Sequence, residues 1–247
     1  RFSITDVGQA YYARCKAMLL EAEAAQAIVD SARAQPSGVI KMSCPVTLLH
    51  THVGDMLLAY AKHYPAVKLQ LFALNRPVDV LGEGFDLAIR VRPLPLEDSD
   101  LTIRILGYAD QYLVASPELL QHHSIPTHPT ELAHWPLLAH SHATDHYSCT
   151  LYDSHGNKVA HSYTPQLVTT DMLTLKHAAL RGIGIAQLHA MMVHEALQEK
   201  TLVRVVPDWM PKQEVIHVAF PTRRGMIPAV RYLIEHLAGQ FANHWTG

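Results

Sequence analysis

Residues 38–91 decide the fold, and they read GVIKMSCPVTLLHTHVGDMLLAYAKHYPAVKLQLFALNRPVDVLGEGFDLAIRV. Three stretches of this segment, residues 39–44, 67–74 and 85–91, have the alternating or continuous apolar pattern of β-strands. The two connections between them carry helix signals. A strand-helix-strand-helix-strand order implies a parallel sheet covered by helices, so the sequence predicts an α/β fold.

The two connections differ in length. Thr47 can cap the first helix with its hydroxyl, and Pro65 ends this helix. The apolar stripe of the first helix consists of Leu49, Val53, Met56, Leu57 and Tyr60. In the second connection, Asn75, Arg76 and Pro77 start a short helix, where the missing N–H of proline costs nothing.

The rest of the chain continues the alternation of strands and helices. Strands are expected at residues 101–106 and 111–115, and then at 137–139, 150–152, 159–163, 166–169, 185–188 and 202–206. Two helices lie among them, at residues 171–181 and 189–198, and Gly182 and Gly184 mark the end of the first. A strand at 215–220 and a helix at 228–241 follow.

A long helix is expected before the sheet, over residues 5–34. Asp6 suits its first turn, and the Pro36-Ser37-Gly38 sequence ends it. Its apolar seam recurs alternately every four and three residues, at Ile4, Gly8, Tyr11, Cys15, Met18, Ala22, Ala25, Val29 and Ala32. This heptad spacing favours a contact between two copies of the chain, and a helix packed on its own domain is the alternative.

The composition is that of an ordinary globular protein, with 49% hydrophobic and 17% charged residues among 247. The 20 basic and 22 acidic residues give a formal net charge of −2, which argues against nucleic-acid binding by this chain alone. Cys15, Cys44 and Cys149 lack metal-type spacing and do not suggest a disulfide framework. Because neither a membrane-spanning run nor a signal peptide is apparent, we expect a cytoplasmic protein without a membrane partner.

Several motifs, taken in order, resemble the LysR-type transcriptional regulators. Residues 1–8 (RFSITDVG) are similar to the end of that family's DNA-binding wing, and residues 43–47 (SCPVT) are similar to the first strand of its sensing domain. Further matches are NRPVDV at 75–80, EGFDLAIR at 83–90, LVASP at 113–117, the segment from Asp171 through AALRGIGI at 178–185, and FPTRR at 220–224. Together they cover nearly the whole chain.

The resemblance implies a two-lobed effector domain like the type II periplasmic-binding-protein fold, preceded by a long linker helix. Residues 1–36 would be the linker helix, residues 38–107 plus 215–247 the first lobe, and residues 109–206 the second. The family's winged helix-turn-helix is absent, so promoter DNA would be reached only through that missing N-terminal domain. The resemblance also implies a small-molecule effector between the lobes and a homo-oligomer, either a dimer or a tetramer.

Candidate ligand-binding residues follow from this placement of the cleft, because ligands of such folds lie beyond strand ends and at helix N-termini. Arg90 and Arg92 end a strand and could clamp a carboxylate, or they could be a solvated surface pair. Thr47 could bind an anion or serve only as a cap. The full set of candidates is Pro45, Val46, Thr47, Arg90, Arg92, His140, Ser141, Thr169, Asp171 and Phe220.

No motif indicates catalysis, a cofactor or a metal. The chain has no nucleophile elbow, phosphate loop or dinucleotide fingerprint. His142 and His146 have metal-ligand spacing but lie in an expected loop, and Cys44 fits a small buried residue better than a redox sensor. We therefore expect a ligand-responsive regulator and no enzyme. A periplasmic solute-binding protein and an enzyme on the same scaffold are the alternatives.

Overall fold

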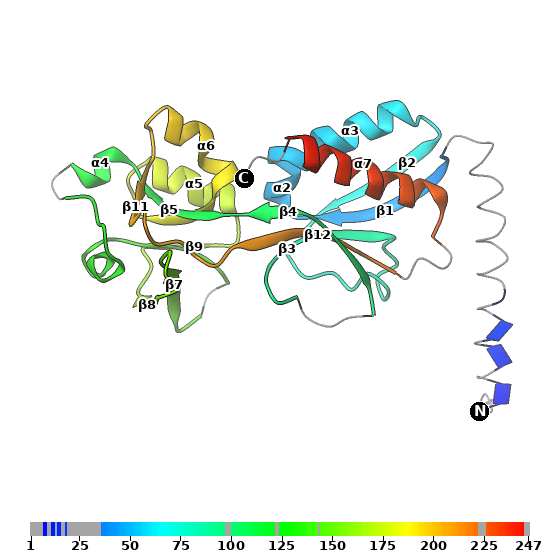
Figure 1. Ribbon diagram of the computed structural model, residues 1–247, viewed down its shortest axis with the longest axis horizontal. Coiled ribbons are helices and arrows are strands. Elements are labelled where there is room, and N and C mark those ends of the chain that lie inside the picture. The colour runs from blue at the N-terminus through cyan, green and yellow to red at the C-terminus, as the bar shows by residue number, and fades with distance from the viewer. Residues whose placement is uncertain are drawn as a thin grey trace.

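Figure 1 shows the computed structural model of the chain. The structure describes residues 36–96, 100–121, 124–142, 144–221 and 226–244, together with residues 7, 8, 11, 12, 14, 15 and 18. The described N-terminal positions are helical, and the rest of the predicted long helix and its seam lies outside the described residues. Tyr11 and Met18 of the seam have exposed fractions of 71% and 68%, so the described part of the chain leaves these side chains uncovered.

The larger sheet has five strands in the order β2-β1-β3-β12-β4. Their bounds are Gly38–Cys44 for β1, Val67–Ala73 for β2, Leu87–Pro93 for β3, Thr102–Ala109 for β4 and Glu214–Phe220 for β12. β1 runs parallel to β2 and β3, whereas β12 is antiparallel to β3 and β4. The predicted parallel arrangement of the first three strands is confirmed.

One continuous helical segment follows β1, and it is made of α2 (Val46–Leu48), the π-helix η1 (Leu49–Val53) and α3 (Gly54–His63). With α7 (Pro228–His244) it covers one face of the five-stranded sheet (Figure 1). The predicted apolar stripe is confirmed: Leu49 is partly buried, and the other four residues are buried. Tyr60 fixes α3 against α7, because its hydroxyl donates to the carbonyl oxygen of Ala229 at 2.8 Å.

Two predictions for this region are wrong. Thr47 does not cap the helix: it is buried inside α2, and Pro45 occupies the N-cap position. The N–H of Val46 donates instead to the side-chain oxygen of Asn75 at 3.1 Å, so the capping oxygen comes from the next connection. The expected short helix that starts at Asn75 is replaced by turns at residues 80–84, which a hydrogen bond from the N–H of Gly82 to Asp79 stabilises.

The region between β4 and β12 builds three smaller sheets. β5 (Gln111–Ala115) pairs with β10 (Ala186–His189) and β11 (Val203–Val205), β6 (Leu138–His140) pairs with β9 (Leu167–Thr169), and β7 (Tyr147–Tyr152) pairs with β8 (Lys158–Tyr163). The helices are α4 (Pro117–Leu120), the 3-10 helix η2 (Pro129–His134), α5 (Met172–Leu180) and α6 (Ala190–Gln198). The sequence predicted α5 and α6 but missed α4 and η2.

The chain crosses twice between the five-stranded sheet and this second region. β4 ends at Ala109 and β5 begins at Gln111, while the return passes through residues 206–213 into β12. The two crossings lie together, because the Gln213 side chain donates to the carboxylate of Asp110 at 2.7 Å. Each region has apolar clusters of its own, and Figure 1 shows the two regions side by side along the long axis.

The described helices include none that is long and apolar enough to cross a lipid bilayer.

Candidate functional site

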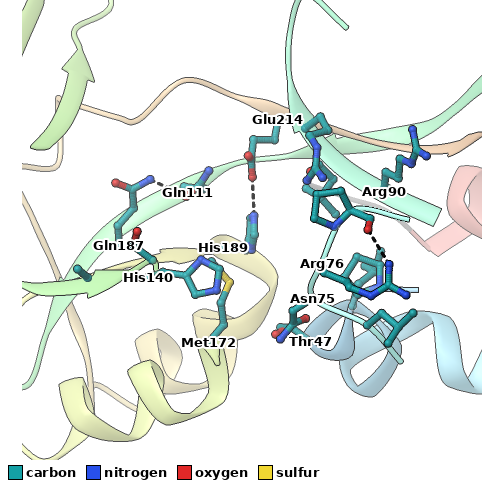
Figure 2. A pocket seen from close by; sticks show the side chains of 18 of the residues that line it. Thr47, Asn75, Arg76, Arg90, Gln111, His140, Met172, Gln187, His189 and Glu214 are labelled. Atoms are coloured by element: carbon teal, nitrogen blue, oxygen red, sulfur yellow. Dashed lines mark hydrogen bonds and ion pairs between the residues drawn. The ribbon is translucent and has the colours of Figure 1, made fainter. Parts of the chain in front are cut away.

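A cavity of about 550 Å³ lies where the two regions meet, and residues of both regions line it. Its walls include the ends of β1 and β3 from the five-stranded sheet, and β5, β6 and β10 from the second region. The volume suits a small organic molecule. Figure 2 shows that the labelled side chains fall into two sets on opposite sides of the cavity.

Asn75 lies on the first wall, the one formed by the five-stranded region, and its side chain makes two hydrogen bonds there. Its side-chain oxygen accepts from the N–H of Val46, and its amide nitrogen donates to the carbonyl oxygen of Thr170 at 3.1 Å. Val46 and Asn75 belong to the first region, whereas Thr170 lies between β9 and α5 of the second. One amide side chain therefore bonds to both regions beside the cavity.

Three arginines line the same wall. Arg90 donates to the carbonyl oxygen of Val78 at 2.8 Å and Arg92 donates to that of Val91 at 2.9 Å. Arg76 is paired with Glu83, and this hydrogen bond holds the pKa of the Glu83 carboxyl at about 2. Burial, with a smaller contribution from the neighbouring charge of Arg92, lowers the pKa of Arg90 from its ordinary value. Figure 2 places Arg76 and Arg90 away from the opposite wall.

The opposite wall consists of two hydrogen-bonded pairs and a histidine. The carboxylate of Glu214 accepts from His189 Nε2 at 2.8 Å, and Gln187 donates to the side-chain oxygen of Gln111 at 2.7 Å. His140 Nε2 lies 3.1 Å from the carbonyl oxygen of Thr170, which can only accept, so the proton of the ring sits on Nε2. Withdrawal from water lowers the pKa of His140 and favours its neutral form.

The structure brings six of the ten predicted site residues to the cavity, and these are Pro45, Thr47, Arg90, Arg92, His140 and Ser141. Thr169 and Asp171 do not line the cavity, and their side chains make hydrogen bonds at the start of α5. The hydroxyl of Thr169 accepts from the N–H of Asp171, and the carboxylate of Asp171 caps α5 by accepting from the N–H groups of Leu173 and Thr174. The N–H of Val46 donates to Asn75, and Phe220 is buried in the apolar core between the five-stranded sheet and its helices.

Sequence reasoning missed many of the residues that line the cavity, among them the polar residues Asn75, Gln111, Gln187, His189 and Glu214. Gln111 and Gln187 carry a weak signal, since each is a polar residue next to buried apolar residues of its strand. Glu214 and His189 carry no such signal. Glu214 starts β12 and His189 occupies the N-cap position of α6, and the two meet only because of how the chain crosses between the regions.

Neither metal ligation nor thiol chemistry is indicated by the described residues. No group of three or more histidine, cysteine or acidic side chains among them could hold a metal ion. Burial raises the pKa of both Cys44 and Cys149, so their reactive thiolate forms are disfavoured.

Comparison with known families gives one match over most of the chain. The family described as the LysR substrate binding domain matches residues 33–242. A relative from Xanthomonas campestris, named an HTH-type transcriptional regulator, is 28% identical over 240 residues, which are 96% of this chain and 69% of that protein. The regulator YhjC of Escherichia coli is also 28% identical, over 97% of this chain and 80% of its own length.

The chain also superposes on solved structures of LysR-type regulators. The full-length structure of AphB, a virulence activator of Vibrio cholerae, superposes with a TM-score of 0.74 at 27% identity and covers 96% of this chain and 80% of its own. The LysR-type regulator CrgA of Neisseria meningitidis superposes with a TM-score of 0.75 at 22% identity, over 98% of this chain and 81% of its own, which supports the fold alone.

Proposed function

Because this chain belongs to the LysR substrate binding domain family, we propose that its cavity binds a small organic effector that carries an acidic group. The chain is the effector-binding domain of a LysR-type transcriptional regulator. Its relatives are named as transcriptional regulators, which favours this function over that of a periplasmic solute-binding protein of the same fold.

The observation that carries the proposal is the pair of guanidinium groups at the end of β3. Arg90 and Arg92 both line the cavity, and among the described residues neither has a carboxylate within salt-bridge distance. The hydrogen bond of each arginine to a backbone carbonyl uses one of the five N–H donors of its guanidinium group. An acidic ligand would satisfy the remaining donors with charge-assisted bonds.

We further propose that the effector acts by changing how two lobes close on each other. The first lobe would contain residues 38–107 and 215–247, and the second residues 109–206. Apart from Glu214, which stands where the chain returns into β12, the two walls of the cavity would then belong to different lobes, and a ligand that bonds to both walls would favour the closed state. A ligand shifts such an equilibrium only by its differential affinity for the two states.

The remaining parts of the proposal rest on the relatives. A regulator of this family is expected to work in the cytoplasm as a dimer or tetramer, and to reach promoter DNA through a helix-turn-helix domain. The exposed seam residues Tyr11 and Met18 support a contact between copies through the N-terminal helix. The absence of a catalytic motif and the names of the relatives favour a function without catalysis.

The test is a thermal-shift screen of small organic acids, followed by calorimetry on the acid that binds best. Arg90→Ala and Arg92→Ala should each weaken binding roughly ten- to a hundredfold, which corresponds to about 1.5–3 kcal/mol for a hydrogen bond to a charged group. Arg104→Ala, at an exposed position of β4, is the matched control and should leave affinity unchanged. Unchanged affinity in both cavity variants would show that the two arginines do not bind the ligand.

A further inference from the structure

The cavity carries a negative charge as well as the positive charges of its arginines. Glu214 is the first residue of β12, the strand that brings the chain back into the five-stranded sheet. It is the one acidic side chain among the described residues that line the cavity. The same space therefore offers guanidinium donors on one side and a carboxylate acceptor on the other.

One hydrogen bond fixes the carboxylate of Glu214, and this carboxylate can accept further hydrogen bonds. His189 Nε2 bonds to Glu214 Oε2 at 2.8 Å, and the two side chains are 11% and 20% exposed. A carboxylate has about four acceptor positions on its two oxygens, and His189 uses one of them. Oε1 of Glu214 has no partner among the described residues, although the side chain is largely withdrawn from bulk water.

Further acceptors surround this carboxylate. The amide of Gln187 donates to Gln111 Oε1, and Oε1 of Gln187 accepts no hydrogen bond from the described part of the chain. The ring of His140 carries its proton on Nε2, and its Nδ1 is then a lone-pair acceptor. Figure 2 shows Glu214, His189, Gln187 and His140 on the same side of the cavity, across from Arg76 and Arg90.

We propose that the effector of this site is a hydroxy acid or an amino acid, whose hydroxyl or ammonium group donates a hydrogen bond to Glu214 while its acidic group faces the arginines. The inference rests on the proposed function, because it assigns the second end of the same ligand. An acid without a donor would place apolar or like-charged surface against Glu214 and leave that carboxylate with an unmet acceptor. Glu214 would then determine specificity by excluding such acids.

The experiment compares three matched series of straight-chain acids as probes. One series runs from propionate to hexanoate, and the others carry a terminal hydroxyl or a terminal ammonium group on the same chains. Calorimetry measures each acid on the unmodified chain, on Glu214→Ala and on Glu214→Gln. Glu199→Gln, at the exposed end of α6, serves as the control for the loss of an acidic residue.

On the unmodified chain and on the control, the best substituted acid should bind roughly ten- to a hundredfold more tightly than the unsubstituted acid of equal length. Glu214→Ala should abolish this preference without weakening the unsubstituted acids. Glu214→Gln separates the two ligand types, because its amide oxygen still accepts from a hydroxyl but no longer attracts an ammonium charge. Chemical denaturation curves of each variant establish that the chain remains folded.

Three outcomes would overturn the inference. If substituted and unsubstituted acids bind equally, the proposed function stands and the role of Glu214 is wrong. If Glu214→Ala weakens all acids by the same factor, Glu214 supports the shape of the cavity and does not select the ligand. If no acid in any series binds, the acidic-effector proposal fails and the inference fails with it.

Discussion

The side-chain amide of Asn75 donates to the backbone carbonyl of Thr170 at 3.1 Å, across 95 positions of sequence. Asn75 follows β2 of the five-stranded sheet, and Thr170 stands just before α5 of the second region. The same carbonyl oxygen lies 3.1 Å from His140 Nε2. Because the other end of the Asn75 amide accepts from the N–H of Val46, one side chain both caps the helical segment after β1 and joins the two regions.

Replacing Asn75 by aspartate should separate these two functions. A carboxylate at this position keeps an oxygen for the N–H of Val46, but it loses the donor and repels the carbonyl of Thr170. Asn75→Ala loses both bonds. We expect each lost neutral bond to cost about 0.5–1.5 kcal/mol, and hydrogen exchange to report which one is lost.

The exchange pattern distinguishes the two variants. The amide of Val46 should exchange faster in Asn75→Ala and at the original rate in Asn75→Asp. Effector affinity should change in both, since both lose the bond between the regions. Equal protection of Val46 in the two variants would contradict the assignment of the capping role to Asn75.

Much of the fold could be predicted because the relevant signals are local. The strands β1, β2 and β3 were visible as apolar runs, and the buried stripe of α3 followed from its helical spacing. The missed elements, α4 and η2, are helices of four and six residues. Elements this short hold too few turns for a periodic pattern to appear.

The site was harder to predict because its geometry depends on long-range contacts. The cap at Val46 comes from Asn75, 29 positions away, and no local pattern separates this arrangement from a cap by Thr47. The bond between His189 and Glu214 joins segments 25 positions apart at the crossing of the chain. Phe220 belonged to a family-like motif, but the alternation of β12 turns its side chain into the core.

Removing the cap of α5 should destabilise the second region. The carboxylate of Asp171 accepts from the N–H of Thr174 at 2.9 Å and from the hydroxyl of Thr174 at 2.6 Å. Asp171→Ala should therefore lower the free energy of unfolding by about 0.5–2 kcal/mol, and Asp171→Asn by less. Urea denaturation measures both. These bonds lower the pKa of Asp171. The difference in unfolding free energy between the unmodified chain and Asp171→Ala should therefore shrink as the pH falls below about 4.

Gly184 should tolerate no side chain, for steric reasons. A Cβ at this position would lie 2.7 Å from the carbonyl oxygen of Pro136 and 2.8 Å from a methyl carbon of Leu138. We expect Gly184→Ala to destabilise the fold by about 1–3 kcal/mol through overpacking. Gly239, inside α7 with open space around it, is the matched control: Gly239→Ala should raise stability by about 0.5–1 kcal/mol. Similar effects of the two substitutions in urea would show that the close approach at Gly184 is absent.

The stability of the chain should fall as the pH drops below neutrality, and His217 should account for part of that loss. Its side chain is 2% exposed, and its Nδ1 has no hydrogen-bond partner among the residues that the structure describes. Burial lowers the pKa of His217, and the charges of Arg90 and Arg92 lower it further. Below pH of about 6.5 the unfolded chain binds a proton at this residue and the folded chain does not. Proton binding therefore stabilises the unfolded chain, and the free energy of unfolding falls as the pH falls.

Replacing His217 by leucine should therefore reduce the dependence of the unfolding free energy on pH between about 7 and 5. The slope should not vanish, because burial also lowers the pKa of His52 and His140. Urea curves at several pH values measure the slope, and His134→Gln, at an exposed position, controls for the loss of a histidine. Comparing slopes separates the titration from the change in packing, since packing shifts the unfolding free energy by a similar amount at every pH. A slope equal to that of the unmodified chain would mean that His217 takes up its proton equally in the folded and unfolded states.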